Sequence, residues 1–362
     1  MRHAFKSPLM YLCMLLFVLS ACQGKETTFD YQLIPMPNEL VAKPGYFVLD
    51  NDKPLYVSSE LLTSSDSIIN SFVLQLKNAS GYAASAQSLA GNEALPEKGI
   101  LFVINKELPE EAYTLSITNN RVLVEASTRN GLFYAIQTIK QLLPVSVYGG
   151  NSGDVVEWTL PCTEIKDAPR FAYRGMMIDV ARHFFPVEEM KRIINVMSIH
   201  KLNTLHWHLT DDQGWRIEIK KYPLLTQVGS KRTDTQVGGF GSEKRAGCAH
   251  EGYYTQEEVK EIIAYAKARH IKIVPEIEMP GHASASIAAY PWLGTKNEKI
   301  DVPIVFGKHY HTYNVIDPKV QDFLEDVISE VLALFKTDVI HIGGDEVRFN
   351  HWEEDEKMVA YK

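Results

Sequence analysis

Two adjacent carboxylates, Asp345 and Glu346, follow two adjacent glycines at the end of a short apolar run, residues 338–342. Carboxylates are costly to bury, so a strand that stops on two of them places them where the backbone leaves the core. In α/β proteins this edge is where active sites usually lie. A pair of carboxyl groups there can act as general acid and base. Taken alone, the pair would fit a solvated loop equally well.

Three earlier segments end in the same way, with an apolar run that stops on ionisable residues. They are residues 173–182, 204–215 and 271–282. The carboxyl ends of successive parallel strands meet at one edge of a sheet, so the polar side chains that follow them lie close together. We therefore expect the four strand ends to share one polar rim, with Asp345 and Glu346 as its catalytic centre.

The elements that must position this rim alternate between strand and helix in the second half of the chain. One helix begins at about Val187, directly after Pro186. Another begins at Thr255, where Glu258 completes a capping box, and a third begins at Asp317, an N-cap followed by proline. This alternation predicts right-handed βαβ units and a parallel sheet. A (β/α)8 barrel and an open doubly wound sheet both fit this α/β pattern.

Two of these helices carry a continuous apolar stripe. The stripe of the first consists of Val187, Met190, Ile194 and Met197. The stripe of the helix after Asp317 consists of Val320, Phe323, Leu324, Val327 and Val331. Apolar residues at this spacing share one face of a helix, so we expect both helices to cover the sheet.

Residues 31–165 have a different, mixed pattern that predicts a small α+β domain. Strand-like runs occur at residues 46–49, 99–104, 113–117 and 122–125, and helical patterns at residues 61–76 and 131–143. The closely spaced strands predict a mostly antiparallel sheet. No chemistry is evident in this domain, and the second domain is expected to span residues 166–362.

The amino terminus has the pattern of a targeting segment. Arg2 and Lys6 precede an apolar run at residues 9–19, which is short for a membrane span and suits a signal peptide. The following residues resemble a bacterial lipoprotein box, which predicts cleavage after residue 21, lipidation of Cys22 and a tether over residues 22–30. Gln23 after the lipidated cysteine favours the outer membrane of the cell envelope, facing either the periplasm or the surface. A plain secretory signal is the alternative.

Composition narrows the classes of function. The chain has 362 residues, of which 45% are hydrophobic and 23% charged, as expected for a globular protein with room for two cores. A formal net charge of -8 without a basic stripe argues against nucleic acid as a partner. Beyond Cys13 and Cys22, only Cys162 and Cys248 remain, and their spacing matches no disulfide framework or metal motif.

Four sequence blocks together resemble family 20 glycoside hydrolases, the β-N-acetylhexosaminidases. In the order in which that family has them, they are FAYRGMMIDVARH at residues 171–183, HWHLTDDQGWR at 206–216, PEIEMPGH at 275–282 and HIGGDEV at 341–347. The domain at residues 31–165 also resembles that family's non-catalytic N-terminal domain. The resemblance implies a (β/α)8 TIM barrel, of which about the first four βα units are present, preceded by the small α+β domain.

The resemblance implies a chitobiase-like, exo-acting enzyme that hydrolyses terminal, non-reducing β-linked GlcNAc or GalNAc. In this family the 2-acetamido carbonyl of the substrate attacks the anomeric carbon, so no protein nucleophile is needed. Glu346 would be the general acid, with partial burial and Asp345 raising its pKa towards neutrality. Asp345 would accept the acetamido N–H and stabilise the positive charge of the intermediate. No cofactor and no metal are implied.

Supporting roles follow from the same resemblance. Arg174, expected at the end of the first barrel strand, matches an arginine that grips the sugar hydroxyls, which its guanidinium fork suits. Asp211 and Asp212 after the second strand, and Glu278 and His282 after the third, match a polar network that contacts the sugar and supports the acid. Many relatives have aspartate at the position of Glu278.

A metal-dependent TIM-barrel hydrolase is a different class that also deserves comparison. His206 and His208 are two residues apart, so they point to one face of a strand, and Asp211 is close by. Such a set can bind a metal ion. The pair lies on the second strand, however, whereas metal-dependent amidohydrolase barrels usually have it on the first. Inhibition by a chelator would distinguish the two classes.

The amount of barrel in this sequence raises a third alternative. A complete barrel needs about 250 residues and eight strands, yet about 190 residues follow Asp167 and four strands are evident. The sequence is therefore interpreted as truncated within the barrel. Half a barrel exposes two sheet edges and an apolar face, which favours self-association, for example as a dimer. The alternative to an active enzyme is an inactive fragment or a glycan-binding surface lipoprotein.

Overall fold

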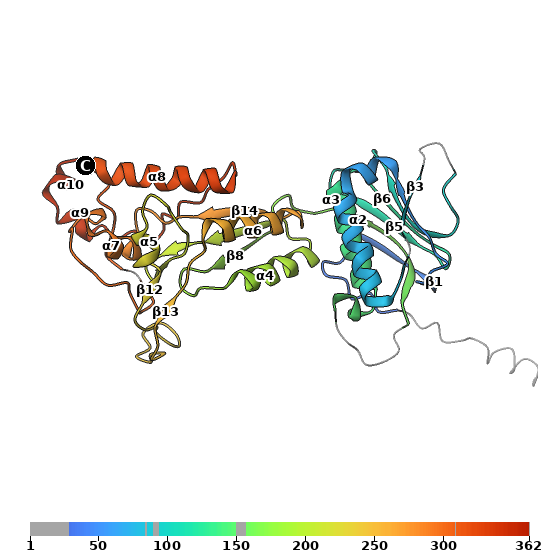
Figure 1. The fold of residues 1–362 in the computed structure, drawn as a ribbon, viewed down its shortest axis with the longest axis horizontal. Helices are drawn as coiled ribbons and strands as arrows, with labels where there is room; N and C mark the ends of the chain where they lie inside the picture. The colour runs from blue at the N-terminus through green and yellow to red at the C-terminus, as the bar shows by residue number, and fades with distance from the viewer. Residues whose placement is uncertain (1–28, 84, 90–93, 150–156, 308, 362) are drawn as a thin grey trace, which may run out of the picture. The chain divides into compact units, whose positions relative to one another are not determined.

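The computed structural model describes residues 29–83, 85–89, 94–149, 157–307 and 309–361. It divides into two compact units, Met1–Pro169 and Arg170–Lys362, each with its own hydrophobic core (Figure 1). The predicted signal segment, the predicted lipoprotein box and Cys22 lie outside the described residues. Within the described helices, the search for an apolar stretch of membrane-spanning length finds no candidate.

The first unit is a seven-stranded sheet with two long helices. Its elements are β1 (Glu39–Val48), β2 (Leu55–Ser58), α2 (Ser59–Ser80), β3 (Ala86–Leu89), β4 (Gly99–Ile104), β5 (Tyr113–Ile117), β6 (Arg121–Ala126), α3 (Arg129–Leu142), the 3-10 helix η1 (Val145–Tyr148) and β7 (Thr159–Asp167). The strand order is β1-β7-β5-β6-β4-β2-β3. The predicted strands at 99–104 and 113–117 are confirmed, and the predicted helices correspond to α2 and α3.

The prediction of a mostly antiparallel sheet is wrong. Pairs β1/β7, β7/β5 and β5/β6 are antiparallel, but β6/β4, β4/β2 and β2/β3 are parallel. The helix α2 connects β2 to β3 and so allows these neighbours to run in the same direction, which a tight turn cannot do.

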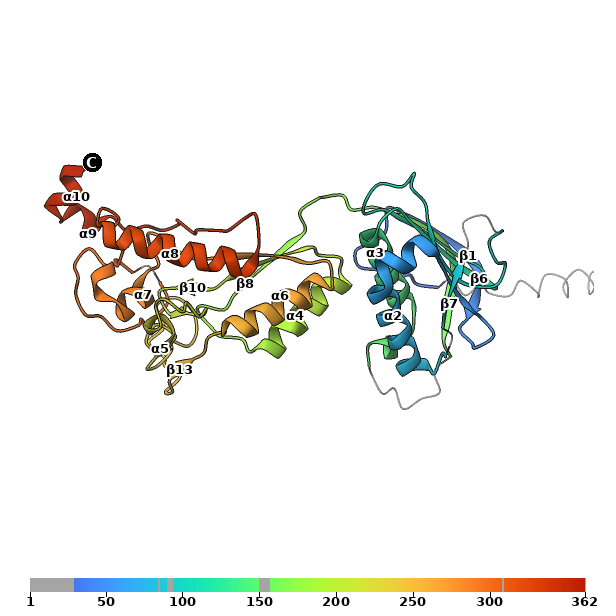
Figure 2. The same cartoon turned by 45° about the horizontal axis from the view of Figure 1, so that its top comes forward.

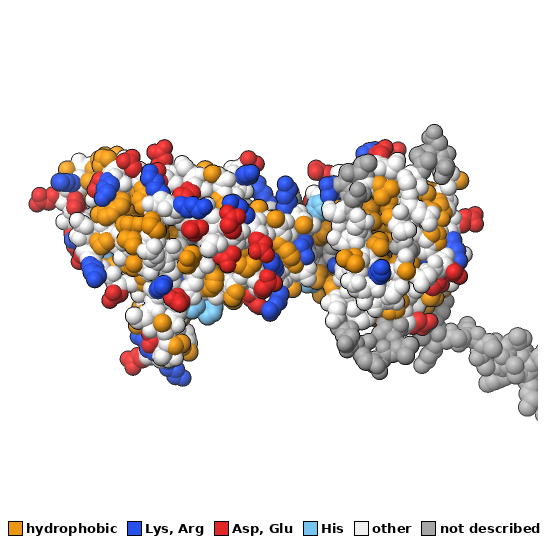
Figure 3. Space-filling model, in the orientation of Figure 1, with side chains coloured by type: hydrophobic (Ala, Val, Ile, Leu, Met, Phe, Trp, Pro, Cys, Tyr) orange, Lys and Arg blue, Asp and Glu red, His pale blue; other side chains and the backbone are white. Residues whose placement is uncertain are grey.

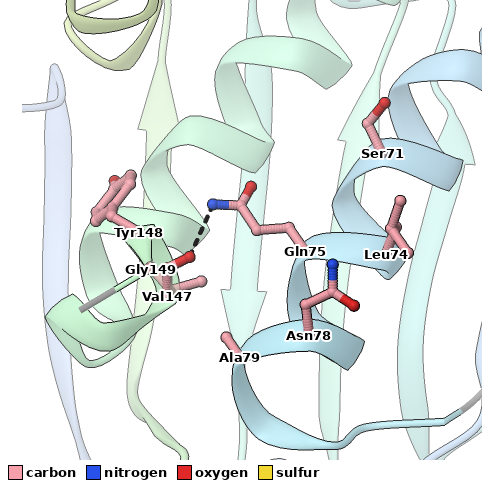
Figure 4. A pocket seen from close by; sticks show the side chains of 8 residues that line it. All are labelled: Ser71, Leu74, Gln75, Asn78, Ala79, Val147, Tyr148 and Gly149. Atoms are coloured by element: carbon pink, nitrogen blue, oxygen red, sulfur yellow. Dashed lines mark hydrogen bonds between the residues drawn. The ribbon is translucent and has the colours of Figure 1, made fainter. Parts of the chain in front are cut away.

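Between α2 and η1, Gln75 donates a hydrogen bond to the Val147 carbonyl across a shallow groove that Ser71, Asn78 and Tyr148 help to line (Figure 4).

The second unit alternates strands with helices. Its elements are β8 (Gly175–Asp179), α4 (Val187–Ile199), β9 (Thr204–His208), β10 (Thr210–Asp211), β11 (Gly214–Trp215), α5 (Leu224–Gln227), β12 (Lys231–Arg232), β13 (His250–Glu251), α6 (Gln256–Lys267), β14 (Lys272–Glu276), α7 (Ser284–Ala289), η2 (Pro291–Leu293), α8 (Pro318–Phe335), α9 (Asn350–Glu353) and α10 (Glu356–Tyr361). Strands β8, β9 and β14 form a parallel sheet in chain order.

The fourth expected strand, residues 338–342, lies beside β14 but pairs less extensively than a strand does. A parallel bridge joins Glu276 to His341, and the His341 N–H and carbonyl bond to Pro275 and Ile277. The segment therefore continues the parallel order β8-β9-β14. Four consecutive neighbours in chain order favour a barrel, because a doubly wound sheet reverses its strand order.

The three long helices of this unit form as their end signals predict. Pro186 precedes α4, Thr255 and Glu258 make a complete capping box on α6, and the Asp317 side chain caps α8. The helices pack in chain order, α4 against α6 and α6 against α8, and α4 and α6 lie side by side in Figures 1 and 2. Their predicted stripes are buried, except that Val187 and Leu324 are only partly so.

Candidate active site

The carboxyl ends of the parallel strands bring together the ionisable side chains of the second unit. Strand β8 ends at Asp179, β9 at His208 and β14 at Glu276. Every segment between one of these strands and the next helix leaves from the same edge of the sheet. We call this edge, with its connecting segments, the carboxyl face.

Both aspartates of the Asp211-Asp212 pair are buried, each with 1% exposure, and both contact His282. The His282 Nδ1 atom lies 3.1 Å from Asp211 and 3.0 Å from Asp212. Ser284 adds two hydrogen bonds to Asp212, one from its N–H and one from its hydroxyl. The sequence alone left open which aspartate faces inward, and the structure shows that both do.

Arg182 is the main counter-ion of Asp211. Its Nη2 atom lies 2.6 Å from the Asp211 carboxylate, and its Nη1 atom lies 3.1 Å from Asp179. Burial alone would raise the pKa of Asp211, but hydrogen bonds from His208 and His282, together with the Arg182 charge, lower it to about 2. Asp211 is therefore ionised throughout the physiological range.

His282 joins the buried aspartates to the predicted catalytic pair. Burial lowers its pKa, but its hydrogen bonds to Asp211 and Asp212 dominate and raise the pKa to about 11. The imidazole is therefore cationic at neutral pH. Its other nitrogen, Nε2, is buried without a hydrogen-bond partner and lies 3.8 Å from Asp345 and 3.9 Å from Glu346.

The turn that carries Asp345 and Glu346 has unusual backbone angles. Gly343, Gly344 and Glu346 have φ values of 66°, 95° and 49°. Positive φ is unfavourable for residues with a side chain, so Glu346 is held in a strained conformation. Side-chain exposure is 68% for Asp345 and 40% for Glu346. Glu346 is therefore partly buried, as expected for the general acid, and Asp345 is more exposed.

Glu278 packs beneath this turn. Its side chain is buried, and one carboxylate oxygen accepts a 3.4 Å hydrogen bond from the Gly344 N–H. A Cβ atom at Gly343 would lie 1.7 Å from the same carboxylate, so only glycine fits at this position. Burial, with the nearby charges of Asp211 and Glu276, raises the pKa of Glu278 to about 8. Glu278 is therefore mostly protonated at neutral pH.

Glu278→Gln is expected to stabilise the protein more at pH 7.5 than at pH 5. Because the folded-state pKa of Glu278 is raised above its ordinary 4.5, its contribution to stability is complete below pH 4.5 and is lost as the pH rises towards 8. Glutamine mimics the protonated acid and cannot ionise. The difference in unfolding free energy should grow by at most about 1.4 kcal/mol per pH unit in this window.

Denaturant unfolding of both proteins at the two pH values measures this difference. Glu325→Gln, at an exposed position on α8, is the matched control. If the difference in unfolding free energy between wild type and Glu278→Gln were the same at both pH values, Glu278 would be ionised when buried.

Among the described residues, three groups of histidine and acidic side chains are close enough to hold a metal ion: His206, Glu276 and His341; His208, Glu276 and Glu278; and Asp211, Asp212 and His282. In the first group, His206 lies 2.6 Å and His341 lies 2.8 Å from the Glu276 carboxylate. Two ligands at about 2.0–2.1 Å from a tetrahedral ion would be about 3.3 Å apart. These shorter contacts are those of direct hydrogen bonds, so the geometry favours a hydrogen-bonded cluster.

The expected position of Arg174 is wrong. Arg174 directly precedes β8, at the amino edge of the sheet and not at the carboxyl face. Its guanidinium donates hydrogen bonds to the carbonyl oxygens of Lys201 and Phe171. Arg174 was expected at the end of the first strand, but β8 begins only at Gly175, so the arginine precedes this strand. In the structure its backbone instead bonds to Asn203, before β9 begins.

Sequence reasoning missed Arg182, Glu276 and Gln213 as members of the site. Arg182 follows the first strand in the way that Asp211 follows the second. Its position shortly after Asp179 could therefore have identified it as a site residue. Gln213 accepts a hydrogen bond from Arg182 and donates one to the Val305 carbonyl. It thereby joins two segments of the carboxyl face that are far apart in the sequence. Periodicity does not reveal such a contact.

Sequence profiles match almost the whole described chain. The profile "Glycosyl hydrolase family 20, catalytic domain" matches residues 171–361, and "Glycosyl hydrolase family 20, domain 2" matches residues 30–168. The chain is 38% identical to a beta-hexosaminidase of Porphyromonas gingivalis, with 94% of this chain and 43% of that protein aligned. It is 37% identical to a beta-hexosaminidase of Vibrio furnissii, with 91% and 51% aligned. The chain thus spans about half the length of these curated relatives.

A solved structure shows the same similarity in three dimensions. A family 20 exo-β-N-acetylglucosaminidase of Vibrio harveyi, in complex with N-acetylglucosamine, superimposes with a TM-score of 0.73 at 31% sequence identity. The alignment covers 93% of this chain and 50% of that one. The similarity therefore extends over both units.

Proposed function

The chain belongs to glycosyl hydrolase family 20, and on this basis we propose that it supplies the acid/base centre of an exo-acting β-N-acetylhexosaminidase. The substrate would be a glycan or glycoconjugate with a terminal, non-reducing β-linked GlcNAc or GalNAc. The observation that carries the proposal is the position of His282. Its imidazolium faces Asp211 and Asp212 through one nitrogen and Asp345 and Glu346 through the other.

The reaction is substrate-assisted and retains the anomeric configuration. The acetamido carbonyl oxygen of the substrate attacks the anomeric carbon, while Glu346 protonates the departing glycosidic oxygen. Asp345 accepts the acetamido N–H, which orients the carbonyl and stabilises the positive charge that develops on the oxazolinium ring. Glu346, now a carboxylate, then takes a proton from the water that opens this ring.

His282 supports Asp345 and Glu346 during these reaction steps. Glu346 becomes negatively charged when it donates its proton, and an imidazolium 3.9 Å away stabilises that charge. Asp211 and Asp212 keep His282 cationic because they hold its other nitrogen by hydrogen bonds. The buried aspartates thus act on the reaction through His282.

Hydrolysis of a chromogenic N-acetyl-β-glucosaminide tests the proposal. The chain from residue 23 onward is assayed beside a form extended through any downstream reading frame, with and without a chelator. Product with the β configuration at the first turnover, unaffected by the chelator, would support substrate-assisted catalysis. No hydrolysis by either form would contradict the proposal and would leave an inactive or glycan-binding protein. Loss of activity with the chelator would favour the metal-dependent class.

We further propose that the protein is anchored to the outer membrane through lipidated Cys22. The support is the apolar run at residues 9–19, the following lipoprotein box and Gln23. Two outcomes would agree with the proposal: partition of the wild-type protein into detergent, and recovery of Cys22→Ser in the aqueous phase. Aqueous partition of the wild type would contradict it.

Dimerisation is a further proposal, supported by the sheet edge at β8. Within the described residues, β8 pairs only with β9, and Met176 and Met177 are exposed by 41% and 52%. An unpaired strand with exposed apolar side chains favours association. Sedimentation equilibrium would support the proposal if it gave a dimer mass, and a monomer mass at all concentrations would contradict it.

A further inference from the structure

We infer that Phe240, with Phe306 and Tyr310, forms an aromatic platform for the leaving-group sugars, which follow the terminal N-acetylhexosamine that the enzyme removes. We call these three side chains the aromatic ledge. The inference rests on the proposed function and adds to it a substrate class, oligosaccharides with an uncharged sugar as the leaving group.

Both loops of the ledge leave from the carboxyl face. Phe240 lies between β12 and β13, in the connection from β9 to α6. Phe306 and Tyr310 lie in the connection from β14 to α8. Each connection starts where a parallel strand ends, as do Asp211, His282 and the other site residues. The loop between β12 and β13 projects from its unit, with hydrophobic side chains visible on its surface (Figures 1 and 3).

The projecting loop is held in place by Gln236. This side chain is buried, accepts a hydrogen bond from the Phe306 N–H and donates one to the Ser242 carbonyl. Its backbone N–H donates to the Ile304 carbonyl. Asp234 holds the base of the loop by accepting hydrogen bonds from the Thr235 and Gly247 N–H groups. Gln236 therefore ties the loop that carries Phe240 to the loop that carries Phe306.

Phe240 is the most exposed large hydrophobic side chain among the described residues, with 88% of its surface accessible. It stands between Gly239 and Gly241, which have no side chains to cover it. A Cβ atom on Gly307 would lie 3.1 Å from the edge of its ring, so Phe240 approaches the other loop closely. Phe306 and Tyr310 are exposed by 36% and 49%. Apolar side chains that adjoin one another on an exposed surface mark binding sites.

Short chains of contacts connect the loops of the ledge to the candidate site. Gln213 bonds to the Val305 carbonyl on one side and to Arg182 on the other, and Arg182 pairs with Asp211. The guanidinium of Arg348, two residues after Glu346, lies over the Tyr310 ring at 5.6 Å. The ledge therefore borders the site. The leaving group of an exo-acting enzyme must point out of the site, which makes this border a position for the next sugar.

The chemistry of the ledge fits a sugar ring. Pyranose rings carry C–H groups on their faces that pack against aromatic rings, while their hydroxyl groups remain in water. The three rings supply apolar faces for such packing, and Phe240 is the most exposed of them. An aryl glycoside that consists of one sugar and a small leaving group would not extend to Phe240.

Substitution at Phe240 tests the inference with two substrates. Phe240→Leu keeps apolar bulk but removes the ring face. We expect it to lower kcat/KM for tri-N-acetylchitotriose about tenfold, equivalent to ~1.4 kcal/mol, and to leave kcat/KM for an aryl N-acetyl-β-glucosaminide unchanged. Phe240→Trp should restore the chitotriose value. Val237→Ala, an exposed apolar position on the same loop, is the control and should change neither substrate. Equal loss on both substrates, or none, would overturn the inference.

A binding measurement separates this inference from the proposed function. Tryptophan fluorescence of Phe240→Trp is titrated with tri-N-acetylchitotriose, beside the wild-type protein, whose five tryptophans supply the background signal. A spectral change in the variant alone would support the ledge even if neither form of the protein hydrolysed the aryl substrate. If the fluorescence spectrum of Phe240→Trp did not change on titration, the inference would be overturned. The proposed hydrolytic activity would not be, because it is measured separately.

Discussion

Replacing Glu346 by glutamine is expected to lower kcat for a substrate with a poor leaving group about 10²- to 10⁴-fold, the usual contribution of general acid catalysis. Glutamine keeps the size and hydrogen-bonding capacity of the side chain but has no proton to give to the departing oxygen. KM should change little, because the substrate is held by other groups. Steady-state kinetics with an alkyl or sugar N-acetyl-β-glucosaminide measures the effect.

The dependence on the leaving group identifies the role of Glu346. A dinitrophenyl leaving group departs without protonation, so its cleavage should lose far less than that of the alkyl glycoside. Glu353→Gln, an exposed glutamate on α9, is the matched control and should retain full activity. If Glu346→Gln lost the same factor with both leaving groups, Glu346 would act in some way other than as the proton donor.

Asp345→Asn is expected to lower kcat about 10²- to 10³-fold, the range found when one group that stabilises transition-state charge is removed. Asparagine matches the shape of aspartate but has no negative charge to stabilise the oxazolinium ring. Its amide also removes the negative charge that lies 3.8 Å from His282 Nε2. Kinetics with the same alkyl and dinitrophenyl glycosides measures the effect.

The pattern for Asp345→Asn should be the opposite of that for Glu346→Gln. Asp345 acts on the attacking acetamido group, so good and poor leaving groups should lose comparable factors. Asp322→Asn, at an exposed position on α8, is the control. If Asp345→Asn lost activity only with poor leaving groups, the two roles would have to be exchanged.

The parts of the fold that the sequence predicted well depend on local signals. Thr255 and Glu258 cap α6, Asp317 caps α8, and Met190 and Ile194 lie on a buried stripe of α4, because each pattern acts within one or two helical turns. The direction of strand pairing in the first unit was predicted less well. The parallel β6/β4 pair joins residues that a hairpin does not connect, and no short motif encodes it.

The candidate site shows the same division. Asp345, Glu346 and His282 could be proposed from the sequence because each directly follows a strand-like run, and the four blocks carry a family resemblance. The position of Arg174 could not, because it depends on where β8 begins. Because β8 begins at Gly175, two residues later than the expected segment, Arg174 lies at the amino edge of the sheet, where its guanidinium donates a hydrogen bond to the Lys201 carbonyl.

The sequence by itself determined the family, the alternation of strands and helices, and the residue types at the strand ends. These are properties of neighbouring residues, set by helix caps, apolar spacing and short motifs. Only the tertiary structure decided that His282 lies between two pairs of carboxylates, that Glu278 fits beneath Gly343, and that Gln213 joins Arg182 to the 305–310 segment. Those contacts bring together residues tens of positions apart, so local spacing encodes neither the hydrogen bonds that raise the pKa of His282 nor the burial that raises the pKa of Glu278.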